Sequence, residues 1–481
     1  MNYRLLIYIL RQVMRLLALC MLIPFVSSAI LGEVEVFFSF AAMIVVLVGL
    51  SLLLGIVKTK KKSIYAREGF IVVALTWMMI SFFSAVALFF TGHYASFVDA
   101  LFESVAGFTT TGSSVIRDLT AMPKSILLWR SFTQWLGGMG VLVFIVAVLP
   151  MTGGRMHHLM RAESPGPAPG KLVPRMKDTA SILYFIYAGM TLAQMILLIV
   201  GGMPVFDSVL ISLSTASTGG FGVSYPSIAS YGNVYAQWVI TVFMILFGTN
   251  FHVLFLLFRR RWKAALRNEE VLWYLGIFAV SSILIGCNIY SQYTSVGETV
   301  RIASFEAASI LTTSGFSSAD FTLWPQFSRG ILIVLMFLGG CAGSTSGGIK
   351  ISRIIIMVKI CKKQIKKFLN SRAVTVVKMN GQTVEEETLG GISAYIIAYF
   401  LVLLISFLLL SAGGMSFEET VTASISSLNN IGPGLGSIGP MGNYADVPAF
   451  CKLILSLNML IGRLEIFPMI VLMSPSVWRN R

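Results

Sequence analysis

Charged residues are scarce in this chain of 481 residues, since Asp, Glu, Lys and Arg make up only 12%. An ordinary soluble domain carries roughly 25%. Hydrophobic residues make up 56%, and the mean hydropathy is +0.82. These values exclude a soluble globular protein and predict an integral membrane protein. At about 20 apolar residues for each helical span, roughly eight to ten spans fit within the chain.

Cysteine and histidine are also rare. The five cysteines have no CxxC spacing, so the sequence predicts no disulfide framework and no zinc ribbon. The four histidines include no HExxH motif, and no set of nucleophile, base and orienting residue is apparent. We therefore expect a protein that is not an enzyme and that holds no organic cofactor.

Acidic residues are outnumbered by basic ones, 21 to 36, which gives a formal net charge of +15. Twenty-nine basic residues fall into six groups that alternate with apolar runs, within 4–15, 58–67, 155–177, 259–267, 350–378 and 479–481. Because basic residues favour the cytoplasmic side of a membrane, we expect all six groups, and both termini, to be cytoplasmic. A nucleic-acid-binding protein would gather them on one face with aromatic residues between, so membrane lipid, and no nucleic acid, is the expected neighbour.

The apolar runs form an N-terminal pair followed by four repeated units. Each unit has a long apolar span, a shorter amphipathic segment ending in small polar residues and glycine, and a second long span. The second spans are predicted at 125–150, 234–258, 328–358 and 448–473. The pattern predicts an all-α membrane protein with an N-terminal two-helix hairpin and four helix–pore loop–helix repeats in a pseudo-fourfold arrangement. The predicted boundaries are 1–62 for the hairpin and 63–160, 161–262, 263–372 and 373–481 for pore repeats 1 to 4.

The short segments align on one glycine each, Gly112, Gly219, Gly315 and Gly432. About 12 to 15 residues precede each glycine, too few to cross a hydrocarbon core of about 30 Å as a helix and return. Irregular backbone at this depth is tolerated only within protein or beside water. Four such loops on one axis therefore predict the wall of a pore. For a single loop, close helix packing through small residues is the alternative, but four loops in register favour the pore.

The residues beside these glycines suit a dehydrated cation. A helix that ends within the membrane directs the negative end of its dipole toward the axis, and the extended residues after it can turn carbonyl oxygens inward. Glycine permits a positive φ without a Cβ in the lumen. The candidate filter residues are Thr110, Thr111, Gly112, Ser217, Thr218, Gly219, Thr313, Ser314, Gly315, Asn430, Ile431 and Gly432. Because Asn429, Asn430 and Ile431 replace hydroxyl residues in the fourth repeat, the ring cannot be fourfold in chemistry.

A second glycine-rich stretch, GGCAGSTSGG at 339–348, interrupts the second span of the third unit. Gly343 to Gly348 matches part of a phosphate loop, but Ile349 stands where lysine is required, so nucleotide binding is rejected. Five glycines in ten residues each cost about 1 kcal/mol in a helix, so the span is predicted to unwind in mid-membrane. Two interpretations remain open from the residues alone, a hinge or a gate across the pore.

Arg463 lies in the middle of the last apolar span, where a charge costs roughly 2.5 to 3.5 kcal/mol. It therefore needs a partner, and carbonyl oxygens of the loop 339–348 or water in the pore are the candidates. An electrostatic barrier near the gate and a brace between two spans are alternative roles. Glu465 is two positions further on and cannot share its helix face.

The chain resembles the bacterial Trk/Ktr potassium uptake family over essentially its whole length, and the N-terminal hairpin looks like the Trk branch. The motifs that carry the resemblance are FTTTG, STGGF, TTSGF, NNIGPGLG, GGCAGSTSGG, RAESPGP at 161–167 and NMLIGRLEIFP at 458–468. The resemblance implies one filter glycine per repeat, potassium bound at the filter residues, and potassium uptake across the bacterial cytoplasmic (inner) membrane. It also implies a homodimer and a cytosolic regulatory ring that binds NAD or ATP/ADP.

The resemblance favours a gate at the glycine-rich loop. The candidate gate residues are Gly339, Gly340, Gly343, Ser344, Thr345, Ser346, Gly347, Gly348, Lys350 and Arg463. The alternative function is a potassium symporter coupled to protons or sodium. Such transporters are commonly built from inverted repeats around a midplane site, whereas the repeats here are parallel.

Overall fold

The structure is a computed structural model that describes residues 3–56, 66–140, 176–371 and 375–475. Several predicted features lie outside these residues: the boundaries at 62, 160 and 372, most of the basic groups 58–67 and 155–177, the stretch 161–167 and the group 479–481. The predicted boundary at 262 falls at the first residue of helix α13 (Trp262–Leu266).

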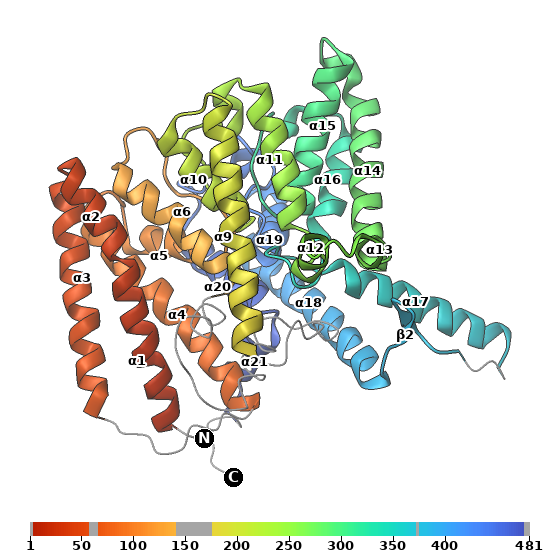
Figure 1. The fold of residues 1–481 in the computed structure, drawn as a ribbon, viewed down its shortest axis with the longest axis horizontal. Helices are drawn as coiled ribbons and strands as arrows, with labels where there is room; N and C mark the ends of the chain where they lie inside the picture. The colour runs from red at the N-terminus through yellow and green to blue at the C-terminus, as the bar shows by residue number, and fades with distance from the viewer. Residues whose placement is uncertain (1–2, 57–65, 141–175, 372–374, 476–481) are drawn as a thin grey trace.

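The N-terminal apolar runs form the predicted hairpin. Helices α1 (Tyr3–Cys20) and α2 (Leu22–Leu31) make one arm, and α3 (Val34–Leu53) returns beside them. The chain reverses at Gly32, whose φ of 72° ends α2 in a conformation that glycine adopts without steric cost. The hairpin packs against α4 (Ala66–Phe90) at one edge of the molecule (Figure 1).

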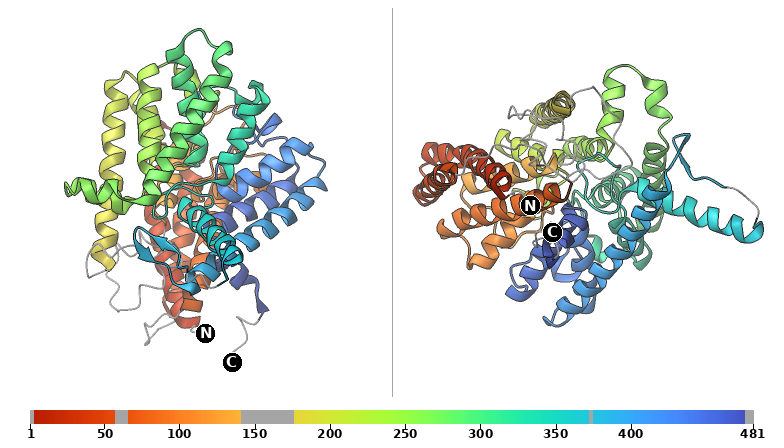
Figure 2. Two further views of the ribbon diagram at one scale, coloured as in Figure 1. Left: turned by 90° about the vertical axis from the view of Figure 1, so that its right-hand side faces the viewer. Right: turned by 90° about the horizontal axis from the view of Figure 1, so that it is seen from below.

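Four segments follow, each with a long helix, a short helix and a second helix. The long helices are α4, α9 (Met176–Val200), α14 (Glu269–Ile289) and α18 (Glu386–Ser411). The short helices are α5 (Phe97–Phe108), α10 (Val205–Ala216), α15 (Val296–Leu311) and α19 (Phe417–Asn429). The second helices are α6 (Lys124–Gly138), α11 (Val234–Phe247), α16 (Gln326–Phe337) and α20 (Ala449–Arg463). Seen from below, the segments follow one another around the molecule in chain order, with the hairpin on the outside (Figure 2).

The remaining regular elements lie on one side of this arrangement or between its helices. Helix α17 (Ile351–Leu369) projects from the body beside the short antiparallel strands β1 (Lys378–Met379) and β2 (Gln382–Thr383) (Figure 1). The described residues also include five short 3₁₀-helices, η1 to η5, at Leu54–Ile56, Ser227–Tyr231, Tyr290–Gln292, Phe321–Leu323 and Gly436–Ile438.

The second spans are not the continuous helices that their hydropathy predicts. Helices α11 and α12 (Phe251–Phe258) meet at 105°, and α20 and α21 (Phe467–Met473) meet at 118°. Helix α6 already ends at Gly138, and α16 ends at Phe337, just before the stretch predicted to unwind. Among the described residues, six helices are long and apolar enough to cross a membrane, or up to eight if each bent pair is one span.

A glycine lies at each break that the sequence did not predict. A Cβ at Gly137 would overlap the carbonyl oxygen of Phe108 at the end of α5, and a Cβ at Gly462 would overlap that of Leu428 in α19. A Cβ at Gly248 would lie 2.4 Å from Oη of Tyr274 in α14 and 2.9 Å from Cγ2 of Thr312, the residue after α15. The second helices therefore break where they pass under the short helices. Hydropathy could not reveal this, because one glycine is tolerated in an apolar helix.

The long helices have apolar side chains on their outer surfaces as well as in the core. Val45, Phe185 and Ile397 are examples of large hydrophobic residues that are mostly exposed on α3, α9 and α18. Exposed apolar surface along whole helices is stable in lipid but not in water. The fold is therefore that of a multi-pass membrane protein.

Candidate ion pore

The four loops that follow the short helices share one backbone conformation. In each loop, two residues separated by one position have a positive φ: Thr110 and Gly112, Thr218 and Gly220, Thr313 and Gly315, and Asn430 and Gly432. The residue between them donates its N–H to a carbonyl five positions earlier: Thr111 to Ala106, Gly219 to Ser214, Ser314 to Ser309 and Ile431 to Ser426, at 2.8 to 3.0 Å. The shared φ pattern and hydrogen bond make the four loops structural equivalents.

This equivalence corrects the sequence alignment of the second loop by one residue. Gly220, with a φ of 76°, corresponds to Gly112, Gly315 and Gly432. Gly219, which the alignment chose, occupies the position of Thr111. Two glycines are adjacent in STGG, and the sequence does not state which one adopts the left-handed conformation.

The four glycines close the loops into a ring. A Cβ at Gly112 would overlap the carbonyl oxygen of Gly219, one at Gly220 that of Ser314, and one at Gly315 that of Ile431. A Cβ at Gly432 would lie 2.7 Å from the carbonyl oxygen of Thr111, back in the first loop. The contacts therefore run in cyclic order through the four segments, and glycine is needed both for its φ and for the close approach.

The short helices are fixed at their outer ends and point their carbonyl ends at the ring. Ser96, Ser295 and Ser416 are N-caps of α5, α15 and α19, and Ser416 forms a capping box with Glu419. Such caps satisfy backbone N–H groups that the helix leaves free. Each short helix ends three or four residues before its ring glycine, so the negative ends of four helix dipoles face the same region.

Buried carboxylates hold the chain that leaves the ring in the first and third segments. Glu103 accepts hydrogen bonds from Val115 N at 2.9 Å and from Nε of Arg130 at 2.7 Å. Glu306 accepts from the N–H groups of Ser318 and Ala319 at 2.6 and 3.2 Å. Both side chains are at most 1% exposed, and removing one buried partner of such a bond costs several times the net value of the bond. The backbone that follows Gly112 and Gly315 is therefore held in place by a buried carboxylate in each segment.

Gln134 of α6 supports the second loop from the neighbouring segment. Its Nε2 donates to the carbonyl oxygen of Gly219 at 2.7 Å, and its Oε1 accepts the N–H of Phe221 at 3.2 Å. Sequence reasoning missed this role, because a single glutamine in an apolar helix belongs to no motif.

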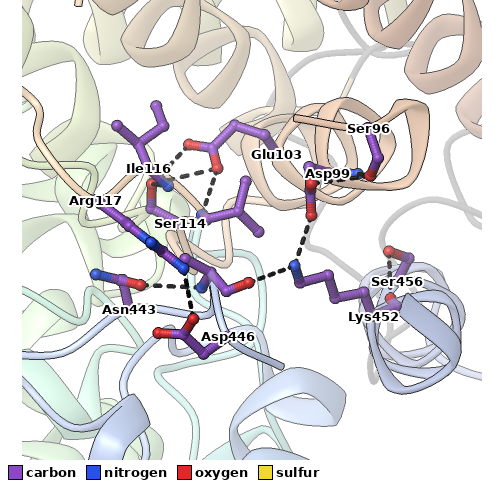
Figure 3. A network of polar contacts seen from close by, with 12 residues as sticks. Ser96, Asp99, Glu103, Ser114, Ile116, Arg117, Asn443, Asp446, Lys452 and Ser456 are labelled. Carbon is purple, nitrogen blue, oxygen red and sulfur yellow. Dashed lines mark hydrogen bonds and ion pairs between the residues drawn. The ribbon is translucent and has the colours of Figure 1, made fainter. Parts of the chain in front are cut away.

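The first and fourth segments are joined by a network of polar contacts near the N-terminus of α5 (Figure 3). Nζ of Lys452 in α20 lies 2.6 Å from Asp99 Oδ1 in α5, and it also donates to the carbonyl oxygen of Ala445 at 2.8 Å. The more exposed Arg117 and Asp446 form a second ion pair at 2.5 Å. These contacts close the ring between the chain segments that are farthest apart in sequence.

The glycine-rich stretch runs as an irregular loop directly beneath the ring. Gly347 donates its N–H to Oγ1 of Thr313 at 2.7 Å, and a Cβ on Gly347 would overlap the carbonyl oxygen of Asn429. Its other end is held by the break between α11 and α12, where Cys341 N donates to Gly248 O at 2.9 Å. The loop 339–348 therefore lies against the carbonyl ends of two short helices.

Glu270 holds the side of this loop that faces away from the ring. Its Oε1 accepts the N–H of Ala342 at 2.6 Å and that of Ser352 at 3.1 Å, so one carboxylate holds both ends of the loop. Nζ of the buried Lys350 donates to the carbonyl oxygen of Ser346. Sequence reasoning missed Glu270, since an acidic residue in the first turn of a helix is common without any further role.

Arg463 has a loop carbonyl, one of the two candidate partners, as an acceptor, together with two other carbonyls. It donates to Thr345 O at 2.9 Å, to Gly137 O at 2.5 Å and to Gly138 O at 2.8 Å. One guanidinium therefore connects the end of α6, the loop 339–348 and the end of α20.

The chain turns sharply after Arg463, and Glu465 and Ile466 both have positive φ. Glu465 forms a largely buried ion pair with Arg353 of α17, whose guanidinium lies 4.0 Å from the ring centre of Tyr395. The start of α17 is thus tied to the break between α20 and α21. Among the described residues, no group of three or more His, Cys, Asp or Glu side chains could hold a metal ion.

Comparison with known proteins agrees with this architecture. The family described as TrkH, cation transport protein, matches residues 35–480. The Trk system potassium uptake protein TrkH of Salmonella typhimurium is 34% identical over 88% of each chain, and that of Halomonas elongata is 35% identical over 100% of each. The crystal structure of the potassium transporter TrkH from Vibrio parahaemolyticus superposes over 100% of each chain with a TM-score of 0.88 and 31% identity. The chain therefore belongs to the TrkH family of cation transport proteins.

Proposed function

We propose that this protein takes up potassium through a channel-like pore whose selectivity filter is the ring of four loops. The observation that carries the proposal is the cyclic contact between each ring glycine and a carbonyl of the next segment. Close-packed backbone carbonyls replace the hydration shell of a cation, and four helix dipoles disfavour anions. The names of the relatives, potassium uptake proteins and a potassium transporter, support potassium as the cation.

The filter consists of the candidate residues predicted from the sequence, with Gly220 added as the ring glycine of the second loop. The loop 339–348 is the gate, because it lies across the cytoplasmic side of the ring and makes few regular backbone hydrogen bonds of its own. Lys350 and Arg463 hold the loop in its closed position through the carbonyl oxygens of Ser346 and Thr345.

The protein acts in the bacterial inner membrane as a homodimer with cytoplasmic termini, and a cytosolic ring that binds NAD or ATP/ADP controls the gate. Helix α17 is the feature that favours control by such a regulator, because it begins directly after the loop, carries exposed lysines and projects from the body of the protein (Figure 1). A partner that moves α17 would pull on the loop directly.

Ion flux in proteoliposomes tests the proposal. Purified protein is reconstituted with a potassium gradient and no proton or sodium gradient, and potassium uptake is measured. Sodium uptake is measured in a separate preparation for comparison. A channel-like pore predicts potassium flux down its own electrochemical gradient. Flux that requires a proton or sodium gradient would instead identify the ion-coupled symporter.

A further inference from the structure

The side chain of Thr313 connects the filter ring to the gate. Thr313 is the first left-handed residue of the third loop, with a φ of 57°, and it is fully buried. Its Oγ1 accepts the N–H of Gly347 at 2.7 Å. Gly347 is itself pressed against the carbonyl oxygen of Asn429 at the end of α19. One filter residue therefore bonds directly to the backbone of the loop beneath it.

The equivalent residues of the other three loops point elsewhere. Thr218 donates its hydroxyl to the carbonyl oxygen of Ser217 at 2.7 Å, within its own loop. Asn430 donates to Thr111 Oγ1 at 3.0 Å and to Met459 O at 2.9 Å. The hydroxyl of Thr110 has no hydrogen-bond partner among the described residues. Within the described chain, Thr313 is the one residue of these four that hydrogen-bonds to the loop 339–348.

We propose that Thr313 is a latch between gate and filter, and a residue that determines selectivity only when the gate is open. This inference rests on the proposed function of the ring and the loop. In the closed state one lone pair of the hydroxyl is occupied by Gly347 N–H. When the loop leaves, the hydroxyl oxygen is free to turn to the axis and ligate a cation, as the hydroxyls of filter residues can.

A bound cation and the open gate consequently favour each other. Potassium at the inner face of the ring competes with Gly347 N–H for the same oxygen, so occupancy of the site shifts the loop toward release. Linkage requires that loop release raise the affinity of that site by the same factor. One ordinary hydrogen bond sets the expected size at about fivefold.

Cys341 provides a reporter of loop position. Its side chain is fully buried in the closed loop, and trypsin cleavage after Arg329 and Lys350 isolates it in the peptide 330–350. The full-length protein in liposomes is treated with a small thiol reagent, and labelling of this peptide is followed by mass spectrometry. Wild type, Thr313→Val, Thr313→Ser and Thr218→Val are compared in potassium chloride and in choline chloride.

The latch predicts that Cys341 is labelled about fivefold faster in Thr313→Val than in wild type when the salt is choline chloride. It also predicts that potassium accelerates the labelling of Cys341 in wild type but not in this variant. Thr313→Ser keeps the hydroxyl and restores the wild-type rate and potassium response. Thr218→Val removes an equivalent side chain that bonds within its own loop, so it labels at the wild-type rate although it alters the ring.

Equal labelling of Thr313→Val and wild type would overturn the latch, and so would equal acceleration in Thr218→Val. Faster labelling of Cys341 in Thr313→Ser than in wild type would assign the effect to the shape of the side chain and not to its hydroxyl group. The underlying function has a separate readout. If a variant without residues 339–348 conducts potassium but Thr313→Val labels as wild type, only the latch fails; if no folded variant conducts, the pore itself fails.

Discussion

The adjacent glycines of the second loop, Gly219 and Gly220, should respond differently to alanine. Gly220 has a φ of 76°, and a Cβ there would overlap the carbonyl oxygen of Ser314. A non-glycine residue in the left-handed conformation costs roughly 1 to 2 kcal/mol, and the carbonyl must also shift. Since about 1.4 kcal/mol corresponds to a factor of ten, we expect Gly220→Ala to lower the potassium-to-sodium permeability ratio by roughly tenfold or more.

Alanine at Gly219 meets a flexible side chain instead of backbone. Its Cβ would lie 2.5 to 2.8 Å from the amide group of Gln134, which can rotate away. The rotation weakens the two hydrogen bonds of the amide, to Gly219 O and from Phe221 N, at about 1 kcal/mol each, but the backbone of the ring stays in place. Gly219→Ala should therefore lower the ratio less than Gly220→Ala does.

A double-mutant cycle with Gln134→Ala separates the two causes. Because the smaller side chain removes the obstacle, Gly219→Ala should have no added effect in the Gln134→Ala background, whereas Gly220→Ala should keep its full effect. The ratio is measured from reversal potentials in planar bilayers, with size-exclusion chromatography as the control for folding. A larger effect at Gly219 than at Gly220 would refute the register assigned from the structure.

Three further predictions concern the ring and the gate. Gly315→Ser should lower the selectivity for potassium over sodium by roughly tenfold, because a Cβ at this position would overlap the carbonyl oxygen of Ile431. The φ of 74° is also a left-handed conformation that costs a non-glycine residue about 1 to 2 kcal/mol. Unchanged flux ratios would remove Gly315 from the filter. Arg463→Ala should raise flux in the absence of a cytosolic partner by about fivefold or more, since the loop loses a donor to Thr345 O; lower flux with normal expression and dimerisation would favour a role in supporting the open pore. Deletion of most of 339–348 should give potassium flux in liposomes without any regulator, and a folded deletion as closed as wild type would exclude the loop as the barrier.

Composition and local pattern were enough to determine the class of the protein and the outline of its fold. Apolar runs of membrane length, separated by basic groups, predict a multi-pass protein because the cost of burying charge in lipid is large and independent of tertiary contacts. Four glycine-containing segments too short to cross the membrane indicate four loops for the same reason. The unwound stretch 339–348 was also predictable, because five glycines in ten residues weaken a helix wherever it lies.

Only the tertiary structure decided which atoms meet. The choice of Gly220 over Gly219 depends on a contact with Ser314, and the breaks at Gly137, Gly248 and Gly462 depend on the ends of the short helices. Arg463 bonds to Gly137, 326 residues away in sequence. Local sequence limits the conformations that each residue can adopt, but a left-handed glycine, a helix break or a buried charge is stabilised by partners that approach through space, and those partners are set by the packing of the whole chain.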